Sequence, residues 1–88
     1  MYAVVDVETT GGKYGEEGIT EIAVYKYDGH ELTDQLISLI NPERPIQPFV
    51  ENLTGINQHM LRNAPKFYEL AKRIVEITND CVLVAHNA

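Results

Sequence analysis

The first segment of the chain, YAVVDVE at residues 2–8, limits most strongly what this sequence can fold into. Its first half is apolar on both faces of an extended strand, a pattern typical of a strand in the middle of a sheet. Asp6 and Glu8 follow in the same segment, and side chains two residues apart on a strand project from one face. We therefore expect a central strand that carries two neighbouring carboxylates near its end.

Two carboxylates so close together need a compensating charge. Burial raises the cost of their mutual repulsion, and no Lys or Arg lies within four residues of the pair. A hard divalent ion such as Mg²⁺ or Mn²⁺ takes oxygen ligands and completes its shell with water and substrate phosphates. The alternative is a strand that ends at Asp6 and leaves Asp6 and Glu8 in water. The setting favours a metal site, and the solvated pair stays open as the alternative.

The residues that follow predict a β-hairpin. Residues 9–18 are rich in glycine and indicate a loop, and the apolar run at 19–27 suits a strand. The sequence DGH at 28–30 is a turn signal, after which residues 31–40 suit another strand. Two strands joined by so short a turn are expected to pair antiparallel.

The second half of the chain predicts helices and a last strand. Three prolines make residues 41–48 a crossover loop. Asn57 can cap a short helix to about Arg62, and Pro65 begins another that runs to about Thr78. An apolar stripe on this second helix indicates packing against a sheet; it comprises Phe67, Leu70, Ala71, Ile74 and Ile77. Residues 81–88 suit a strand parallel and adjacent to the first one, which makes the chain α/β.

Charge and composition narrow the class of protein. The formal net charge is −6, with thirteen acidic and seven basic residues, which argues against a broad surface that neutralises phosphates unless bound cations offset the charge locally. Cys81 is the only cysteine, so no internal disulfide can form and a reducing compartment is expected. Without an apolar run of membrane length, we expect a cytoplasmic protein that does not bind membranes.

Several polar groups are expected to meet at one edge of the sheet. Thr9, Thr10 and Gly11 open a turn directly after the carboxylates, where backbone N–H groups and hydroxyls can approach a ligand. Ligands of α/β sheets gather beyond the carboxyl ends of the strands. Residues 85–88 arrive near the same edge if the first and last strands are parallel.

These motifs resemble a known family, the DnaQ-like, DEDD-type 3′-5′ exonucleases. The sequence VDVETTG at residues 5–11 resembles their first motif, and LVAHNA at 83–88 resembles the start of their second. Between the two, ITEIAVYKYDG, LINPERPI and LTGINQHMLRNAPKF match the family's pattern in kind and order. Within the family, the chain looks most like the proofreading epsilon subunits of bacterial DNA polymerase III.

The resemblance implies a fold and an activity. The fold would be an RNase H-like mixed sheet: a three-stranded antiparallel unit, a helix crossover and a parallel fourth strand. The activity would be metal-dependent 3′-5′ hydrolysis of the 3′-terminal phosphodiester of DNA, releasing nucleoside monophosphates during proofreading in DNA replication. Asp6 and Glu8 would be the catalytic residues that hold two divalent ions, Mg²⁺ or Mn²⁺. The implied partners are a single-stranded 3′ end and DNA polymerase III subunits.

The resemblance also implies residues that bind the terminal nucleotide. Thr9 and Thr10 would place it through backbone and hydroxyl contacts, and Leu53 and Thr54 would pack against the last base and sugar. Relatives often carry a histidine at the position of Thr54. By residue type alone, Leu53 and Ile56 suit the core instead.

The other polar candidates are expected to have minor roles. His86 and Asn87 are expected to make hydrogen bonds around the metal site rather than to bind the ion directly. The remaining candidates have no partners at metal-ligand spacing or lie in a loop, and we expect them at the surface; they are His30, His59, Lys13 and Tyr14.

The family pattern extends past the end of this sequence. Its second-motif Asp is expected shortly beyond Ala88, and its third motif, with the general base and the last acid, further on. Residues 1–88 are therefore expected to be the N-terminal fragment of a single exonuclease domain roughly twice as long. By itself the fragment should be inactive. Two alternatives stay open: a 3′-5′ exoribonuclease similar to oligoribonucleases, and a non-catalytic RNase H-like module that docks on a polymerase.

Overall fold

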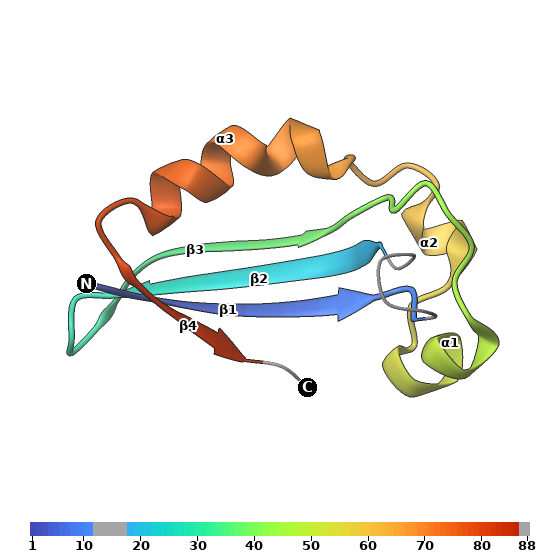
Figure 1. The fold of residues 1–88 in the computed structure, drawn as a ribbon, viewed down its shortest axis with the longest axis horizontal. Coiled ribbons are helices and arrows are strands. Elements are labelled where there is room, and N and C mark those ends of the chain that lie inside the picture. Colours follow the sequence, from blue (N-terminus) through green and yellow to red (C-terminus); the bar gives the residue numbers. More distant parts are fainter. Residues whose placement is uncertain (12–17, 87–88) are drawn as a thin grey trace.

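A four-stranded sheet forms the base of the molecule, with strand order β3-β2-β1-β4 (Figure 1). The structure, a computed structural model, describes residues 1–11 and 18–86. β1 pairs antiparallel with β2 and parallel with β4, and β2 pairs antiparallel with β3. The strands are β1 (Tyr2–Thr9), β2 (Ile19–Tyr27), β3 (Leu32–Leu39) and β4 (Val82–His86). The predicted mixed sheet and the central position of the first strand are thus confirmed.

The core lies between one face of this sheet and the helix α3 (Phe67–Thr78) (Figure 1). Val5 of β1 is paired with Val24 of β2, and Val7 is paired with Ile22, so these side chains share the face that α3 covers. Ile77 of α3 is buried against them. The alternation of side chains along β1 places Val4, Asp6 and Glu8 on the opposite face, which none of the described helices covers as α3 covers the first (Figure 1).

The helix α3 is capped at its start, and an ion pair near its middle joins it to the sheet. At its start, the Lys66 N–H donates to Glu69 Oε1 at 3.0 Å, which is half of a capping box. The Arg73 guanidinium contacts both carboxylate oxygens of Asp34 on β3 at 2.8 Å and holds the pKa of Asp34 below its usual range. Phe67 departs from the predicted stripe: it is 44% exposed, because it is the first residue of the helix and lies over a surface cavity.

A short helix in the crossover, α1 (Pro48–Thr54), was not predicted from the sequence. The predicted crossover loop ends at residue 48, where Pro48 instead begins a helix; a proline is tolerated there because the first N–H has no intrahelical partner. Gly55 closes the helix with a φ of 77°, and its N–H donates to the Glu51 carbonyl at 2.9 Å. The predicted cap of the next helix, α2 (Gln58–Leu61), is confirmed: Asn57 Oδ1 accepts from the Met60 N–H at 2.9 Å.

The helix α1 packs directly on the turn that follows β1. Gly11 has a φ of 75°, and a Cβ atom at that position would lie 2.7 Å from Val50 Cγ2 of α1. The Gln47 N–H donates to the Thr10 carbonyl at 3.0 Å, which ties the crossover to the same turn. The end of β1 and the helix α1 therefore form one unit. None of the helices in the described residues is long and apolar enough to cross a bilayer.

Candidate active site at the end of strand β1

Asp6 and Glu8 lie on the same face of the sheet, as their spacing predicts. In the register of the sheet, Asp6 is paired with Ala23 of β2 and Glu8 with Glu21, and this face is the one turned away from α3. Two residues along a strand span about 7 Å, so the carboxylates are neighbours in space. They lie near the carboxyl end of a strand that has a partner on each side. Asp6 and Glu8 therefore lie side by side on one face of the sheet, near the end of its second strand from the edge.

The surroundings of the carboxylates suit a hard divalent cation. Both side chains are half-buried, and the Oδ1 atom of Asp6 is buried. An ionised carboxylate is costly to bury, and a bound divalent ion offsets that cost. In residues 1–11 and 18–86, no three His, Cys, Asp or Glu side chains come together as a metal-binding group. Asp6 and Glu8 would therefore supply only part of an ion's coordination shell.

A cavity of ≈ 450 Å³ opens beside Glu8, lined by Glu8, Glu21, Leu53, Thr54 and Ile56. This volume lies in the range of about 300–1,000 Å³ that small-molecule sites occupy. The fold thus brings Leu53 and Thr54, at the end of α1, next to Glu8, which precedes them by 45 and 46 residues in the chain. Leu53 is 81% exposed whereas Ile56 is 7% exposed. The expectation from residue type, that both side chains lie in the core, is therefore confirmed for Ile56 and wrong for Leu53.

Thr54 and Thr10 belong to the predicted nucleotide site. The hydroxyl groups of both residues form hydrogen bonds with the backbone of this chain. Thr54 Oγ1 donates to the Val50 carbonyl at 2.8 Å and accepts from the Ile56 N–H at 3.2 Å. Thr10 is 1% exposed, and its Oγ1 donates to the Gly11 carbonyl at 3.2 Å and accepts from the Gly18 N–H at 3.0 Å. The Thr10 hydroxyl thus joins Gly11 and Gly18, and its predicted contact with the terminal nucleotide stays a prediction. Thr9 is half-buried at the end of β1, and its Oγ1 lies 3.4 Å from the Gly11 N–H that donates to it.

Glu21 is a member of this cavity that the sequence analysis did not single out. It lies across from Glu8 on β2 and lines the same cavity. Its signal in the sequence is weak, because one glutamate on an alternating strand usually marks a solvent-facing position. Only the pairing of β1 with β2 shows that the carboxylates of Glu8 and Glu21 lie on the same face of the sheet.

The other candidate residues fall where they were expected or lie outside the described part of the chain. His30 and His59 are exposed, which confirms their assignment to the surface. Cys81 is a free, half-buried cysteine. Lys13, Tyr14 and Asn87 lie outside the described residues, so their predicted roles stay predictions.

The fold has counterparts among solved nucleases. A structure of exonuclease X in complex with 5′ overhanging duplex DNA superposes with a TM-score of 0.79 at 28% identity, covering 98% of this chain and 48% of exonuclease X. The nuclease domain of 3′hExo, a DEDDh family member, superposes with a TM-score of 0.76 at 20% identity, covering 98% of this chain and 50% of that domain. The class that the fold defines is therefore the RNase H-like exonucleases.

Sequence comparison gives the family. The RNase_T exonuclease family model matches residues 3–88, and the chain belongs to that family. The 3′-5′ exonuclease DinG of Staphylococcus aureus (strain USA300) is 38% identical over 86 residues, which is 98% of this chain. The chain spans about a tenth of that relative's length.

Proposed function

We propose that the protein containing this chain is a metal-dependent 3′-5′ exonuclease that hydrolyses the 3′-terminal phosphodiester of DNA and releases nucleoside monophosphates. The observation that carries the proposal is the placement of Asp6 and Glu8 on one face at the end of β1, beside a cavity of nucleotide size. Membership of the exonuclease family and the 3′-5′ polarity in the name of the DinG relative support the same activity. The complex of exonuclease X with duplex DNA supports DNA as the substrate.

In this proposal, Asp6 and Glu8 are the catalytic residues that hold two divalent ions, Mg²⁺ or Mn²⁺. Two such ions supply activation of a water molecule and stabilisation of the attacking and leaving oxygens in an in-line displacement. Asp6, which lies further into the sheet with its Oδ1 buried, would hold an ion together with Glu8. Glu8 also lines the cavity, so its carboxylate can hold an ion and accept a hydrogen bond from the terminal 3′-hydroxyl.

The cavity beside Glu8 is proposed to hold the terminal nucleotide. Leu53 offers an exposed apolar side chain against which a base can pack, and Ile56 forms a buried wall behind it. The Thr54 hydroxyl is bonded to the backbone of α1, so Thr54 shapes the cavity chiefly through its methyl group and its position. Thr9 at the end of β1 is proposed to contact the same nucleotide.

The exposed apolar side chains of β4 support the proposal that residues 1–88 are the N-terminal part of one exonuclease domain. β4 is an edge strand, and Val82, Leu83 and Val84 are all exposed. An apolar edge strand is normally covered or paired in a folded protein. Because the chain covers 48% and 50% of two solved relatives, we propose that a segment equivalent to their remaining half covers β4 and supplies the other metal ligands.

The sequence resemblance to polymerase III epsilon subunits adds a narrower proposal: proofreading during DNA replication in the cytoplasm, in contact with polymerase III subunits. This role stays a prediction. The DinG relative, which is 38% identical, is named as a 3′-5′ exonuclease, and its name mentions no polymerase. Exoribonuclease activity and non-catalytic docking remain the outcomes that would replace the proposal.

The proposal is tested with the full-length protein and DNA oligonucleotides labelled at the 5′ end. We expect Mn²⁺ or Mg²⁺ to produce a ladder of products shortened one nucleotide at a time from the 3′ end, with release of nucleoside monophosphates. A 3′-phosphate should slow the reaction, because Glu8 is proposed to contact a free 3′-hydroxyl. RNA of the same sequence is the control for sugar preference. Failure to hydrolyse either polymer with either metal would contradict the enzyme and favour the docking module.

Replacing Leu53 with alanine should weaken substrate binding without harming the fold. The side chain is 81% exposed, so the free energy of unfolding should change by no more than about 0.5 kcal/mol. Loss of the apolar contact with the terminal base should raise KM by about tenfold, because covering a leucine side chain is worth up to about 1.5–3 kcal/mol. Steady-state kinetics and urea unfolding measure the two effects. Val75→Ala, which truncates an exposed apolar residue of α3 outside the cavity, is the control and should leave KM unchanged.

A further inference from the structure

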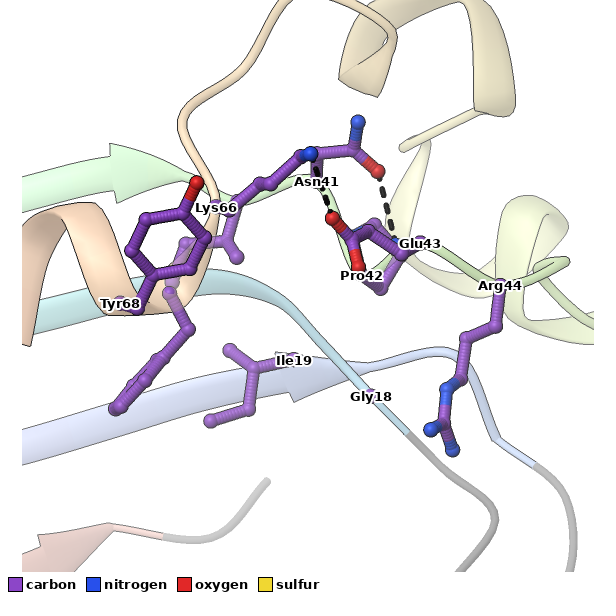
Figure 2. A pocket seen from close by; sticks show the side chains of 10 residues that line it. Gly18, Ile19, Asn41, Pro42, Glu43, Arg44, Lys66 and Tyr68 are labelled. Atoms are coloured by element: carbon purple, nitrogen blue, oxygen red, sulfur yellow. Dashed lines mark hydrogen bonds and ion pairs between the residues drawn. The ribbon is translucent and has the colours of Figure 1, made fainter.

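A β-bulge in β2 turns Glu21 toward the same face of the sheet as Glu8. Along β2, the pairing with β1 passes from Glu21 to Ile19 and leaves Thr20 as an extra residue. In a regular strand Ile19 and Glu21 would share a face. Here Ile19 packs against the core on the α3 side and lines a cavity with the first residues of that helix (Figure 2). Bulges re-aim side chains and are frequent beside active sites, and this one leaves Glu21 next to Glu8 without Ile19.

The cavity beside Glu8 has a polar side and an apolar side. Among the described residues, the sheet contributes Glu8 and Glu21 to its lining, and the end of α1 with the residues just beyond it contributes Leu53, Thr54 and Ile56. The Thr54 hydroxyl already donates to and accepts from the backbone, so the acceptors offered to a ligand are chiefly the two carboxylates. A nucleotide in this cavity therefore fits with its base toward Leu53 and its sugar hydroxyls toward the carboxylates.

Glu8 and Glu21 are close enough to contact neighbouring groups of one sugar. Residues directly opposite each other on antiparallel strands have Cβ atoms about 4.5–5.5 Å apart, and these two side chains project from the same face. Because Glu8 is proposed to contact the terminal 3′-hydroxyl, the adjacent group within reach of Glu21 is the 2′-hydroxyl. The amino groups of the bases lie beyond the glycosidic bond, toward Leu53. The pairing thus favours a sugar contact for Glu21 over a base contact.

We propose that Glu21 accepts a hydrogen bond from the 2′-hydroxyl of the 3′-terminal nucleotide, so that the site removes a ribonucleotide from the end of a DNA strand more readily than a deoxyribonucleotide. This inference rests on the proposed exonuclease function and names the terminal sugar that the site selects. The reaction is unchanged. Water forms a bond to phosphorus, the bond from phosphorus to the 3′-oxygen of the preceding sugar breaks, and a proton of the water passes to that oxygen. The products are a ribonucleoside 5′-monophosphate and a strand with a new 3′-hydroxyl.

The test uses the full-length protein with Mn²⁺ and DNA dodecamers that differ only at the 2′ position of the terminal nucleotide, which carries a hydroxyl, a hydrogen or a fluorine. Each is made with adenine and with uracil as the terminal base. Fluorine cannot donate a hydrogen bond, so it separates donation from size. For the wild type, we expect kcat/KM to be about tenfold higher with the hydroxyl than with hydrogen or fluorine, as for one hydrogen bond to a charged group.

Variants at Glu21 should change this ratio of kcat/KM values. Glu21→Ala should bring the ratio of hydroxyl to hydrogen close to one, and Glu21→Gln, which keeps a neutral acceptor, should give an intermediate ratio. Glu76→Ala is the control and should keep the wild-type ratio, because it removes an exposed carboxylate of α3, on the other side of the sheet. Isothermal titration calorimetry gives a readout without cleavage: the wild type should bind adenosine 5′-monophosphate about tenfold more tightly than its 2′-deoxy form, and Glu21→Ala should bind both alike.

The outcomes separate the sugar contact from other roles of Glu21. A wild type without a preference for the 2′-hydroxyl would overturn the proposal. A Glu21→Ala variant that is slower on every dodecamer but keeps the wild-type ratio would also overturn it, because Glu21 would then act on the fold or on the metal site. A ratio that follows the terminal base instead of the 2′ substituent would assign Glu21 to the base and overturn it as well. If no dodecamer is cleaved but the wild type alone prefers the ribose form of the monophosphate, the exonuclease function fails and the sugar contact stands.

Discussion

Replacing Asp6 with asparagine is expected to reduce 3′-terminal hydrolysis by about a thousandfold, the upper range for the loss of one group that stabilises transition-state charge. The substitution keeps the shape of the side chain and removes its charge.

Metal binding gives this prediction a second measurement that is independent of catalysis. A ligand present at a hundred times its Kd stabilises the folded state by about 2.7 kcal/mol. Thermal unfolding of the full-length protein should therefore shift upward with Mn²⁺, and Asp6→Asn should lose most of that shift. Asp80→Asn is the control, since Asp80 is an exposed carboxylate near the start of β1, at the opposite end of the strand from Asp6 and Glu8, and an asparagine tolerates its φ of 59°. A variant at Asp6 that keeps both the rate and the metal-dependent shift would remove the basis of the nuclease assignment.

The second large effect is expected from Gly11→Ala. The φ of 75° costs an alanine about 1–2 kcal/mol, and its Cβ would lie 2.7 Å from Val50 Cγ2 and 3.2 Å from Phe49 Cζ. The side chain of Val50 has little rotamer freedom, so α1 must move, at a further cost of about 1–3 kcal/mol. The free energy of unfolding should fall by about 2–5 kcal/mol, measured by urea denaturation.

Gly55→Ala separates the two contributions to that loss. Gly55 has a φ of 77°, nearly that of Gly11, but a Cβ atom there would have no neighbour within 4 Å. This variant should therefore show only the backbone cost of about 1–2 kcal/mol. Equal losses in the two variants would mean that α1 does not pack tightly on the turn after β1. With a displaced α1, Gly11→Ala should also raise KM, because Leu53 lies on that helix.

Local patterns in the sequence were sufficient to predict the type and approximate bounds of most helices and strands. The strand at 19–27 has the predicted bounds, and the first strand, the hairpin and α3 differ from prediction by one or two residues at their ends. These elements are long and periodic, so their burial patterns can be read from the chain directly. The helix α1 has seven residues and one buried side chain, Val50, so it lacked a periodic signal. The proline at its start and Gly55 at its end were the available cues.

The acid pair could be located in advance because its geometry is local. Strand alternation alone places Asp6 and Glu8 on one face, whatever the rest of the fold does. The parts of the site that come from distant segments could not be derived in the same way. Glu21 meets Glu8 through the register of β1 and β2, which shifts at Glu8 and Thr9. Leu53 and Ile56 have similar apolar side chains, yet one is exposed in a cavity and the other is buried.

Backbone periodicity thus specifies the central strand and the placement of its two carboxylates on one face, since these follow from a few consecutive residues. The cavity that accompanies the pair and the enclosure of Thr10 arise from contacts between segments far apart in the chain. Such contacts depend on how loops cross the end of the sheet and on which side chains the packing leaves uncovered. A pattern within one segment does not encode that arrangement, so the folded structure was needed to show it.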